Sequence, residues 1–368
     1  MAAFTAKDVQ ALREKTGVGM MECKKALVEA EGDMDKAVEI LKERGLATQQ
    51  KKSSRVAAEG VVVAYNDKEN KVGVLVEVNC ETDFVAKNPD FVALANKIAK
   101  TVAEKNPADV DALLATTLTG ADCTVEAAVQ ELFLAIRENM KVRRFARVEG
   151  VVETYIHAGG AVGVMVQFET DDATAAKDEF VAMGKNVAMQ VAAMSPEYLS
   201  ESDITPDELA KMKNITVESA LNKPESLPKP LLKKVFEKVL SEKHWSDEDV
   251  AAYEEQKNNK FLFNFLSKEG IAKLAEVAVT LKDQFVNDVI FGKAVEGRIN
   301  KQIKEICLLN QAFVRTDLFD GNVGGYVANV AKQLGADIKV IGFTRFQRGE
   351  GIEKKADNFA AEIASMVK

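Results

Sequence analysis

An internal repeat is the feature that most limits the folds open to this sequence. Shifting the chain by 90 residues superimposes residues 59–76 on residues 149–166, and nine of the eighteen positions are identical. Self-similarity at a fixed spacing indicates a duplicated structural unit, but two copies are too few for a stacked solenoid. The repeat therefore predicts a pair of related subdomains and an α+β fold class.

Each copy has the pattern of a β-hairpin followed by an amphipathic helix. Alternating valines in the first copy predict a second strand with one buried face, at Val72, Val74, Val76 and Val78. The second copy repeats this alternation at Val162, Val164, Val166 and Phe168. Apolar residues then recur at helical spacing in both copies, at Phe91, Leu94, Ala95, Ile98, Ala99 and Val102, and at Phe180, Met183, Gly184, Val187, Ala188 and Val191.

The two copies differ between the second strand and the helix. The first copy has Glu81-Thr82-Asp83-Phe84-Val85 there, whereas residues 171–175 of the second contain no aromatic residue. From the residues alone, two interpretations are equally supported. Either Thr82 or Asp83 caps the helix while Phe84 makes a local staple contact, or Phe84 projects as an apolar wedge. Because a core role would require a large apolar counterpart in the second copy, the comparison favours the wedge.

Residues 5–45 have the pattern of three short helices, of which the last is expected to end at Gly45. Residues 47–55 are polar and basic, which fits either a linker or an extension of that helix. Met20 and Met21 stand in the loop between the first two helices. Adjacent methionines point to different faces, so one of them should be exposed; methionine suits both irregular core gaps and partner surfaces.

The second half of the chain changes character. Residues 201–290 predict helices without strands, and this block would pack either within the chain or against a second copy. The tail predicts a helix at 326–334, a strand at 338–346, a turn at 347–351 and a last helix at 359–366.

The composition favours a protein that binds over one that catalyses. The 368 residues allow two or three domains, and a net charge of −8 argues against wholesale binding of a nucleic-acid backbone. Basic residues cluster at 141–147, a pattern more typical of an amphipathic edge strand that pairs with carboxylates than of an RNA-facing strand. His157 lies in the second copy's turn, where a histidine is usually just solvated.

Motifs for metal, nucleotide or membrane binding are not found in the sequence. It has two histidines, four scattered cysteines and no phosphate-binding loop. We therefore expect no metal, no cofactor, no membrane span and no signal peptide, which places the protein in the cytoplasm.

Three motifs resemble those of bacterial elongation factor Ts and occur in that family's order. They are LREKTGVGMMECKKAL at 12–27, EVNCETDFVA at 77–86, and GFTRF with GEGIEK at 342–346 and 349–354. The resemblance covers both ends and the centre of the chain. It implies a UBA-like three-helix domain at 1–54, core subdomains at 55–146 and at 147–200 plus 291–346, an inserted helical dimerisation region at 201–290, and a C-terminal helical module at 347–368.

The activity that the resemblance implies is guanine nucleotide exchange on the translational GTPase EF-Tu, in its GDP-bound and nucleotide-free forms, without chemical catalysis. The loop Thr82-Asp83-Phe84-Val85 would enter the GTPase domain and disturb the site that holds magnesium and the phosphates. The remaining partner contacts implied by matched position are Arg13, Met20, Met21, Lys24, Ile136, His157 and Val314. The tail from Gln347 onward would brace a further GTPase helix, and the insertion would support a homodimer.

Two residues depart from the family's pattern. Arg137 follows Ile136 where glycine is common, and Arg315 follows Val314 where an apolar residue is common. The helical block is also longer than in many relatives, with extra sequence at roughly 222–290. The alternative function is a helical adaptor or scaffold without exchange activity, which would bind its partner and leave the nucleotide off-rate unchanged.

Overall fold

The computed structural model describes residues 4–353, which combine helices with two three-stranded antiparallel sheets. This confirms the α+β prediction. Contacts divide the chain into unit 1, which comprises Met1–Ser195, Phe313–Gly321 and Gly325–Lys368, and unit 2, which comprises Pro196–Ala312 and Asn322–Gly324. The last helix predicted at 359–366 lies outside the described residues, and the predicted domain boundaries stay predictions.

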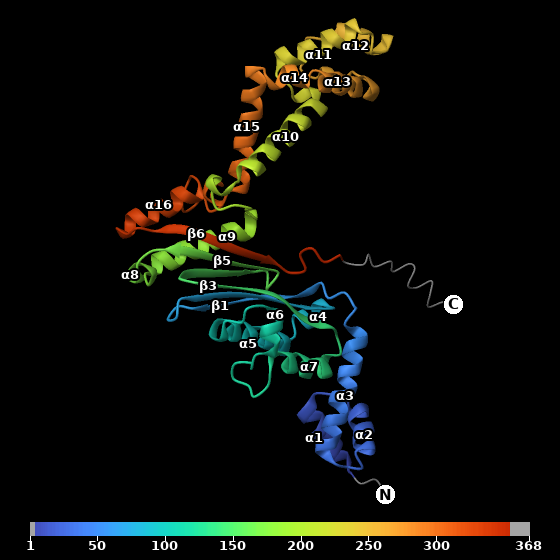
Figure 1. Cartoon of the computed structure of the whole chain (residues 1–368), viewed down its shortest axis with the longest axis vertical. Coiled ribbons are helices and arrows are strands. Elements are labelled where there is room, and N and C mark those ends of the chain that lie inside the picture. The colour runs from blue at the N-terminus through green and yellow to red at the C-terminus, as the bar shows by residue number, and fades with distance from the viewer. Residues whose placement is uncertain (1–3, 354–368) are drawn as a thin grey trace, which may run out of the picture. The chain divides into compact units, whose positions relative to one another are not determined.

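The first nine α-helices of the chain belong to unit 1 (Figure 1). These are α1 (Ala6–Thr16), α2 (Met20–Glu29), α3 (Met34–Lys52), α4 (Asp83–Ala86), α5 (Pro89–Lys105), α6 (Val110–Ala115), α7 (Val125–Ile136), α8 (Asp172–Ala175) and α9 (Asp178–Met194). The strands are β1 (Glu59–Asp67), β2 (Val72–Cys80), β3 (Met140–Glu149), β4 (Val151–His157), β5 (Val162–Glu169) and β6 (Lys339–Gln347). The remaining helices are α10 (Pro206–Asn222), α11 (Lys229–Ser241), α12 (Asp247–Gln256), α13 (Lys268–Thr280), α14 (Lys282–Val286), α15 (Val289–Ile306) and α16 (Val323–Leu334).

Three helices form the N-terminal segment, as predicted, but the third is longer than expected. Helix α3 runs through Gly45 to Lys52, so the prediction that Gly45 ends it was wrong and the alternative of a helical extension is confirmed. A Cβ atom at Gly45 would lie 1.8 Å from Cδ2 of Leu134 in α7. Glycine at position 45 therefore permits a close approach of α7 to α3 rather than a helix end.

The two hairpins predicted from the repeat are confirmed, since β1 pairs with β2 and β4 pairs with β5. The structure also extends the repeat beyond its visible sequence signal. A β-bulge interrupts the ladder at Glu77/Val78 in one sheet and at Gln167/Phe168 in the other, again 90 residues apart. Helix α7 and strand β3 complete the first copy, and α16 and β6 complete the second; the bounds of the helices and the registers of the strands both correspond at an offset of 198 residues. The helical insertion therefore interrupts the second copy between α9 and α16.

The two sheets pack face to face, with α5 on the outer face of one and α9 on the outer face of the other (Figure 1). Every residue of β2 is buried, so the prediction of a single buried face was too simple. One face of β2 packs on α5, and the other packs on the second sheet. The side chains between the sheets are Val62, Leu75, Val152, Met165 and Phe346.

This sheet interface explains identities in the repeat. A Cβ atom at Gly73 would lie 2.6 Å from Cγ1 of Val152, and one at Gly163 would lie 2.4 Å from Cγ1 of Val62. Gly73 corresponds to Gly163 in the repeat, and Val62 corresponds to Val152. Each glycine thus receives the valine of the other copy, which requires both residue types in both copies.

Unit 2 has its own helical core, as predicted for residues 201–290. Buried apolar side chains of α10, α11, α13 and α15 pack together around Phe285, Phe291 and Trp245. The carboxylate of Asp249 is buried and accepts hydrogen bonds from the backbone N–H and the hydroxyl of Ser267, both at 2.7 Å. The insertion therefore packs within the chain, which is one of the two predicted alternatives. Phe261 and Phe265 nevertheless remain exposed.

Candidate functional site

The loop that follows β2 forms the single-turn helix α4 and presents Phe84 to solvent. The hydroxyl of Thr82 accepts a hydrogen bond from the N–H of Val85 at 3.4 Å, so Thr82 caps the turn. Val85 and Ala86 are buried beneath the turn, whereas the Phe84 residue is 82% exposed. Capping and projection therefore occur together, and the staple contact considered for Phe84 is not formed. Because aromatic side chains are enriched at the centres of protein interfaces, Phe84 is a candidate for contact with a partner.

The second copy builds the same turn without the aromatic ring. Asp171 caps α8 by accepting a hydrogen bond from the N–H of Thr174 at 2.9 Å. Thr174 takes the place of Val85 and is buried, while Ala173 takes the place of Phe84. The fold needs the cap and the buried residue in both copies, but it needs the aromatic side chain in neither.

Asp83 provides a negative charge beside the ring of Phe84. Its carboxylate accepts a hydrogen bond from Nζ of Lys87 at 2.7 Å. Both side chains are at least half exposed to solvent. That hydrogen bond lowers the pKa of Asp83 below its ordinary value of 3.8. The side chain is therefore ionised at neutral pH.

Two residues near the turn are fixed by the core. Ile136 is half-buried and packs against the same apolar cluster as Val85. Arg137 has a φ of 65° and closes α7 in the left-handed conformation, which glycine adopts with less strain than other residues. Cys80 is buried and its thiol donates to the carbonyl of Thr82 at 3.1 Å; burial, aided by Glu138 and Glu59, raises the pKa of Cys80 to about 12.

A second exposed group lies on the N-terminal helices. Met20 and Met21, at the start of α2, are 45% and 64% exposed, so both side chains are accessible where only one was expected to be. Arg13 and Lys24 are also exposed. Sequence reasoning missed Val28, which is 61% exposed and lies four residues after Lys24, on the same helical face. The helical spacing from Met21 to Val28 was the available signal.

His157 and Val314 form two further exposed positions. His157 ends β4, and its Nδ1 lies 3.0 Å from the hydroxyl of Tyr155. The N–H of Val314 donates to the side-chain carbonyl of the buried Gln190 at 2.9 Å. Arg315 forms hydrogen bonds to both carboxylate oxygens of Asp317 at 2.8 and 2.7 Å. Within residues 4–353, no hydrogen bond or ion pair joins these positions to the Phe84 turn.

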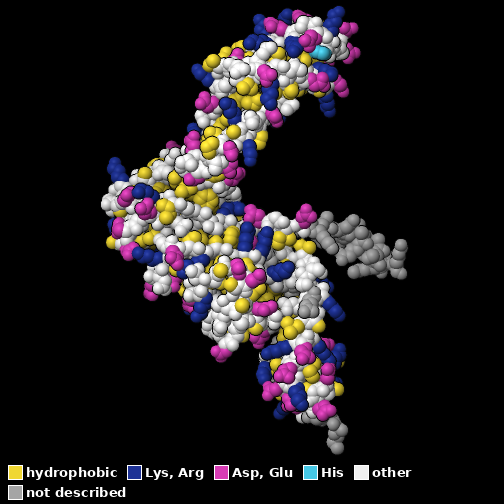
Figure 2. All heavy atoms as spheres, viewed as in Figure 1, with side chains coloured by type: hydrophobic (Ala, Val, Ile, Leu, Met, Phe, Trp, Pro, Cys, Tyr) yellow, Lys and Arg dark blue, Asp and Glu magenta, His cyan; other side chains and the backbone are white. Residues whose placement is uncertain are grey.

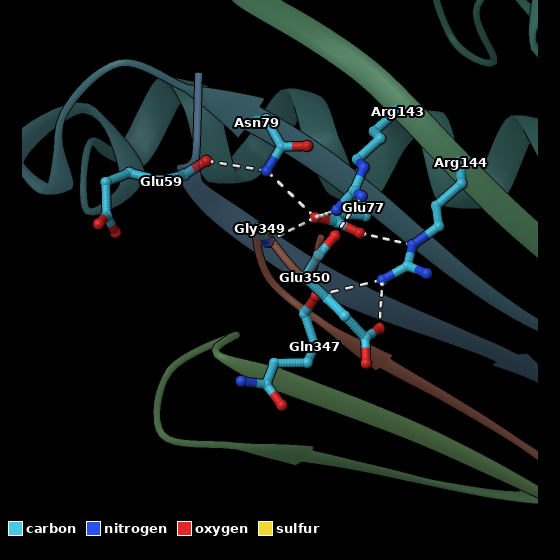
Figure 3. Close-up of polar contacts among 8 residues, drawn as sticks. All are labelled: Glu59, Glu77, Asn79, Arg143, Arg144, Gln347, Gly349 and Glu350. Atoms are coloured by element: carbon cyan, nitrogen blue, oxygen red, sulfur yellow. Dashed lines mark hydrogen bonds and ion pairs between the residues drawn. The ribbon is translucent and has the colours of Figure 1, made fainter. Parts of the chain in front are cut away.

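A buried polar cluster fixes the turn that follows β6 (Figure 3). Glu77 of β2 is fully buried, and its carboxylate accepts from the N–H of Gly349 at 2.8 Å, from Arg143 at 2.9 Å and from Arg144 at 2.6 Å. Burial works to raise the pKa of Glu77, but the hydrogen bonds from Gly349, Arg143, Arg144 and Asn79 outweigh it and lower the pKa below 4.5. The prediction that the basic cluster pairs with carboxylates at a sheet edge is confirmed.

The same turn has a second attachment. Arg348 donates to the carbonyl of Gly60 at 3.2 Å and pairs with Glu59 at 3.0 Å. These contacts hold the predicted turn at 347–351 against the first sheet. The rest of the predicted C-terminal module lies outside the described residues.

Among residues 4–353, no group of three or more His, Cys, Asp or Glu side chains could hold a metal ion. None of the helices described is long and apolar enough to cross a membrane.

Comparison with known proteins places these features in a family. A profile described as "Elongation factor TS" matches residues 81–350. Elongation factor Ts of Clostridium perfringens (strain SM101 / Type A) is 40% identical over 366 residues, which cover 99% of each chain. Proteins of the same name from Clostridium botulinum (strain Alaska E43 / Type E3) and Syntrophotalea carbinolica are each 38% identical, again over 99% of both chains. The chain belongs to the elongation factor Ts family.

Proposed function

We propose that this protein is a guanine nucleotide exchange factor for EF-Tu, in agreement with its family. The observation that carries the proposal is Phe84, a large apolar side chain exposed on a capped turn whose repeat counterpart is Ala173. Thr82 and Val85 hold the turn from either side, and Phe84 with Asp83 enters the GTPase domain. The ionised Asp83 brings negative charge toward the groups that hold magnesium and the phosphates, which weakens nucleotide binding there.

Exchange of this kind depends on differential affinity rather than on acid–base chemistry. The factor binds the nucleotide-free GTPase more tightly than the GDP-bound form, and reciprocity then weakens GDP binding by the same factor. Shifting such an equilibrium from 1:99 to 99:1 requires about 5.5 kcal/mol. Burial of one phenylalanine contributes about 1.5 to 3 kcal/mol, so further contacts are needed.

We assign those further contacts to the other exposed positions. Met20, Met21, Arg13 and Lys24 present an apolar and basic surface on α1 and α2. In this proposal Val28 extends that surface, and the segment forms the UBA-like domain of the family. Ile136, His157, Val314 and the tail from Gln347 add contacts elsewhere on the partner.

The insertion is proposed to join two copies of the chain. A groove of about 430 Å³ lies between α10 and α15, with Val217, Phe291 and Val295 in its lining. Ile215, Val289 and Ile290 are exposed on the same two helices, and Figure 2 shows hydrophobic side chains gathered along this unit. A second copy that covers these side chains makes a homodimer. Sedimentation of the intact chain should show the dimer mass, and a variant that carries both Ile215→Glu and Val289→Glu, at exposed positions of α10 and α15, should sediment as a monomer; equal association states would contradict the assignment.

The direct test measures release of a fluorescent GDP analogue from EF-Tu. We expect the intact chain to accelerate release of the analogue strongly and to bind EF-Tu in the absence of nucleic acid. Both results are expected of a translation factor of the cytoplasm. Binding with an unchanged release rate would instead support the adaptor function. Absence of both binding and acceleration would contradict the family assignment of the partner.

A further inference from the structure

The turn that carries Phe84 is held by a carboxylate from a distant part of the chain. Glu138, which follows α7, accepts a hydrogen bond from the N–H of Thr82 at 3.0 Å and one from its hydroxyl at 2.9 Å. Both donors belong to the residue that caps α4. A carboxylate that accepts two hydrogen bonds from one residue fixes both its position and its orientation.

Glu138 is itself held on both sides, as an anchor must be. Before it, Arg137 closes α7 in the left-handed conformation, and its carbonyl accepts from Nζ of Lys52 at 2.5 Å. After it, the buried Asn139 donates its N–H to the carboxylate of Glu81 at 2.6 Å and its side-chain N–H to the carbonyl of Arg55 at 2.9 Å. The segment 137–139 therefore joins the end of α3 to the residues that precede the Phe84 turn.

The second copy shows that this carboxylate is not a requirement of the fold. The ends of α7 and α16, and the strands that follow them, correspond at an offset of 198 residues, which places Ala336 at the position of Glu138. Alanine offers no acceptor side chain, and yet Asp171 still caps α8 and Thr174 is still buried. The carboxylate and the projecting aromatic thus occur together in one copy and are both missing from the other.

We infer that Glu138 is a positioning residue for nucleotide exchange, which holds the Thr82 cap so that Phe84 stays in its projecting orientation. This inference rests on the proposed function. Glu138 acts through Thr82 and Phe84 rather than by contact with the nucleotide site. Its removal should therefore slow exchange only when Phe84 is present.

The kinetic test combines Glu138→Ala with Phe84→Ala and measures GDP-analogue release at saturating concentrations of the intact chain. Because small misplacements of a functional group cost large factors in rate, we expect Glu138→Ala alone to slow release about tenfold. Added to Phe84→Ala, it should change nothing further. Glu138→Gln, whose amide oxygen still accepts from the N–H of Thr82, should restore part of the rate. Glu131→Ala on the exposed side of α7 is the matched control and should match wild type.

Two results would overturn the inference. One is an unchanged release rate for Glu138→Ala. The other is an equal slowing with and without Phe84, which would mark a general structural role. If the wild-type chain fails to accelerate release, the proposed function fails instead.

A second measurement on the free chain separates these failures. Hydrogen exchange should become faster at the amides of Thr82 and Val85 in Glu138→Ala, while the amides of α5 keep their wild-type rates. Unchanged protection at Thr82 would show that Glu138 does not hold the turn, whatever the activity of the chain.

Discussion

The two halves of the core share one scaffold but differ at the turn that follows their second strand. Both copies have a hairpin, a capped turn, a packed helix and a third strand, and their β-bulges fall at corresponding positions. The first copy adds Phe84 and Glu138, where the second has Ala173 and Ala336. Features present in both copies are those that packing requires. Features of the first copy that its own packing and buried hydrogen bonds do not need are candidates for function, and this separation can be tested position by position.

The largest effect on stability is expected at Glu77, whose counterpart is Gln167. Replacing Glu77 with glutamine leaves Arg143 without an anionic partner and leaves Arg144 with Glu350 alone. Loss of one member of a buried pair costs 3–5 kcal/mol, and partial exposure of the arginines reduces this to about 2 kcal/mol. Hydrogen exchange at the amides of β2 measures the loss. Gln167→Ala should reduce stability by less than about 1 kcal/mol. An equal loss of stability in the two variants would show that Glu77 is no more important to the fold than Gln167.

The ionisation of Glu77 also predicts that the stability of the fold depends on pH. The folded pKa of Glu77 lies below its unfolded value of about 4.5, so its contribution to stability is fully present above that pH. The contribution is lost as the pH falls from about 4.5 through the folded pKa. Thermal unfolding between pH 7 and pH 3 should therefore show a shallower acid decline for Glu77→Gln than for wild type. Parallel declines would show that Glu77 does not contribute to acid sensitivity.

Next in size are the glycines of the sheet interface, where the two copies should behave alike. Gly73→Ala and Gly163→Ala each place a methyl group within 2.6 Å of a valine from the other copy. Overpacking of this kind costs about 1–3 kcal/mol at each position. Chemical denaturation followed by circular dichroism would measure both variants. A large loss of stability in only one of the two variants would show that the facing surfaces of the two sheets are not equivalent.

The smallest effect is expected where α7 and α16 end. Gly335 has a φ of 63° and its counterpart Arg137 has a φ of 65°. Gly335→Ala should cost about 1 kcal/mol, since it introduces left-handed strain that glycine avoids. Arg137→Ala should cost less, because that strain is already present in the wild type. Melting temperatures of the two variants would test this order of costs. A larger fall in melting temperature for Arg137→Ala would show that the side chain of Arg137, rather than its backbone conformation, stabilises the end of α7.

Local patterns in the sequence were enough to predict the hairpins and the exposure of Phe84. Alternation and helical spacing are properties of neighbouring residues, and the comparison of copies showed that the ring was not needed in the core. The pattern at Gly45 was misleading, since a glycine near a helix end resembles a terminator when the approach of Leu134 is not known. The burial of both faces of β2 and the contact of Glu138 with Thr82 join residues that lie far apart in the chain. Such pairings become visible only when the tertiary fold is known.

We propose that exchange activity resides in the turn that distinguishes the two copies. Release of a fluorescent GDP analogue from EF-Tu, compared between the wild-type chain and Phe84→Ala, tests it most directly. Truncating an aromatic interface residue of this kind typically costs about 2 kcal/mol, so we expect acceleration to fall about 30-fold. Stability should change by less than about 0.5 kcal/mol, because the ring is exposed. Normal acceleration by Phe84→Ala would contradict the account.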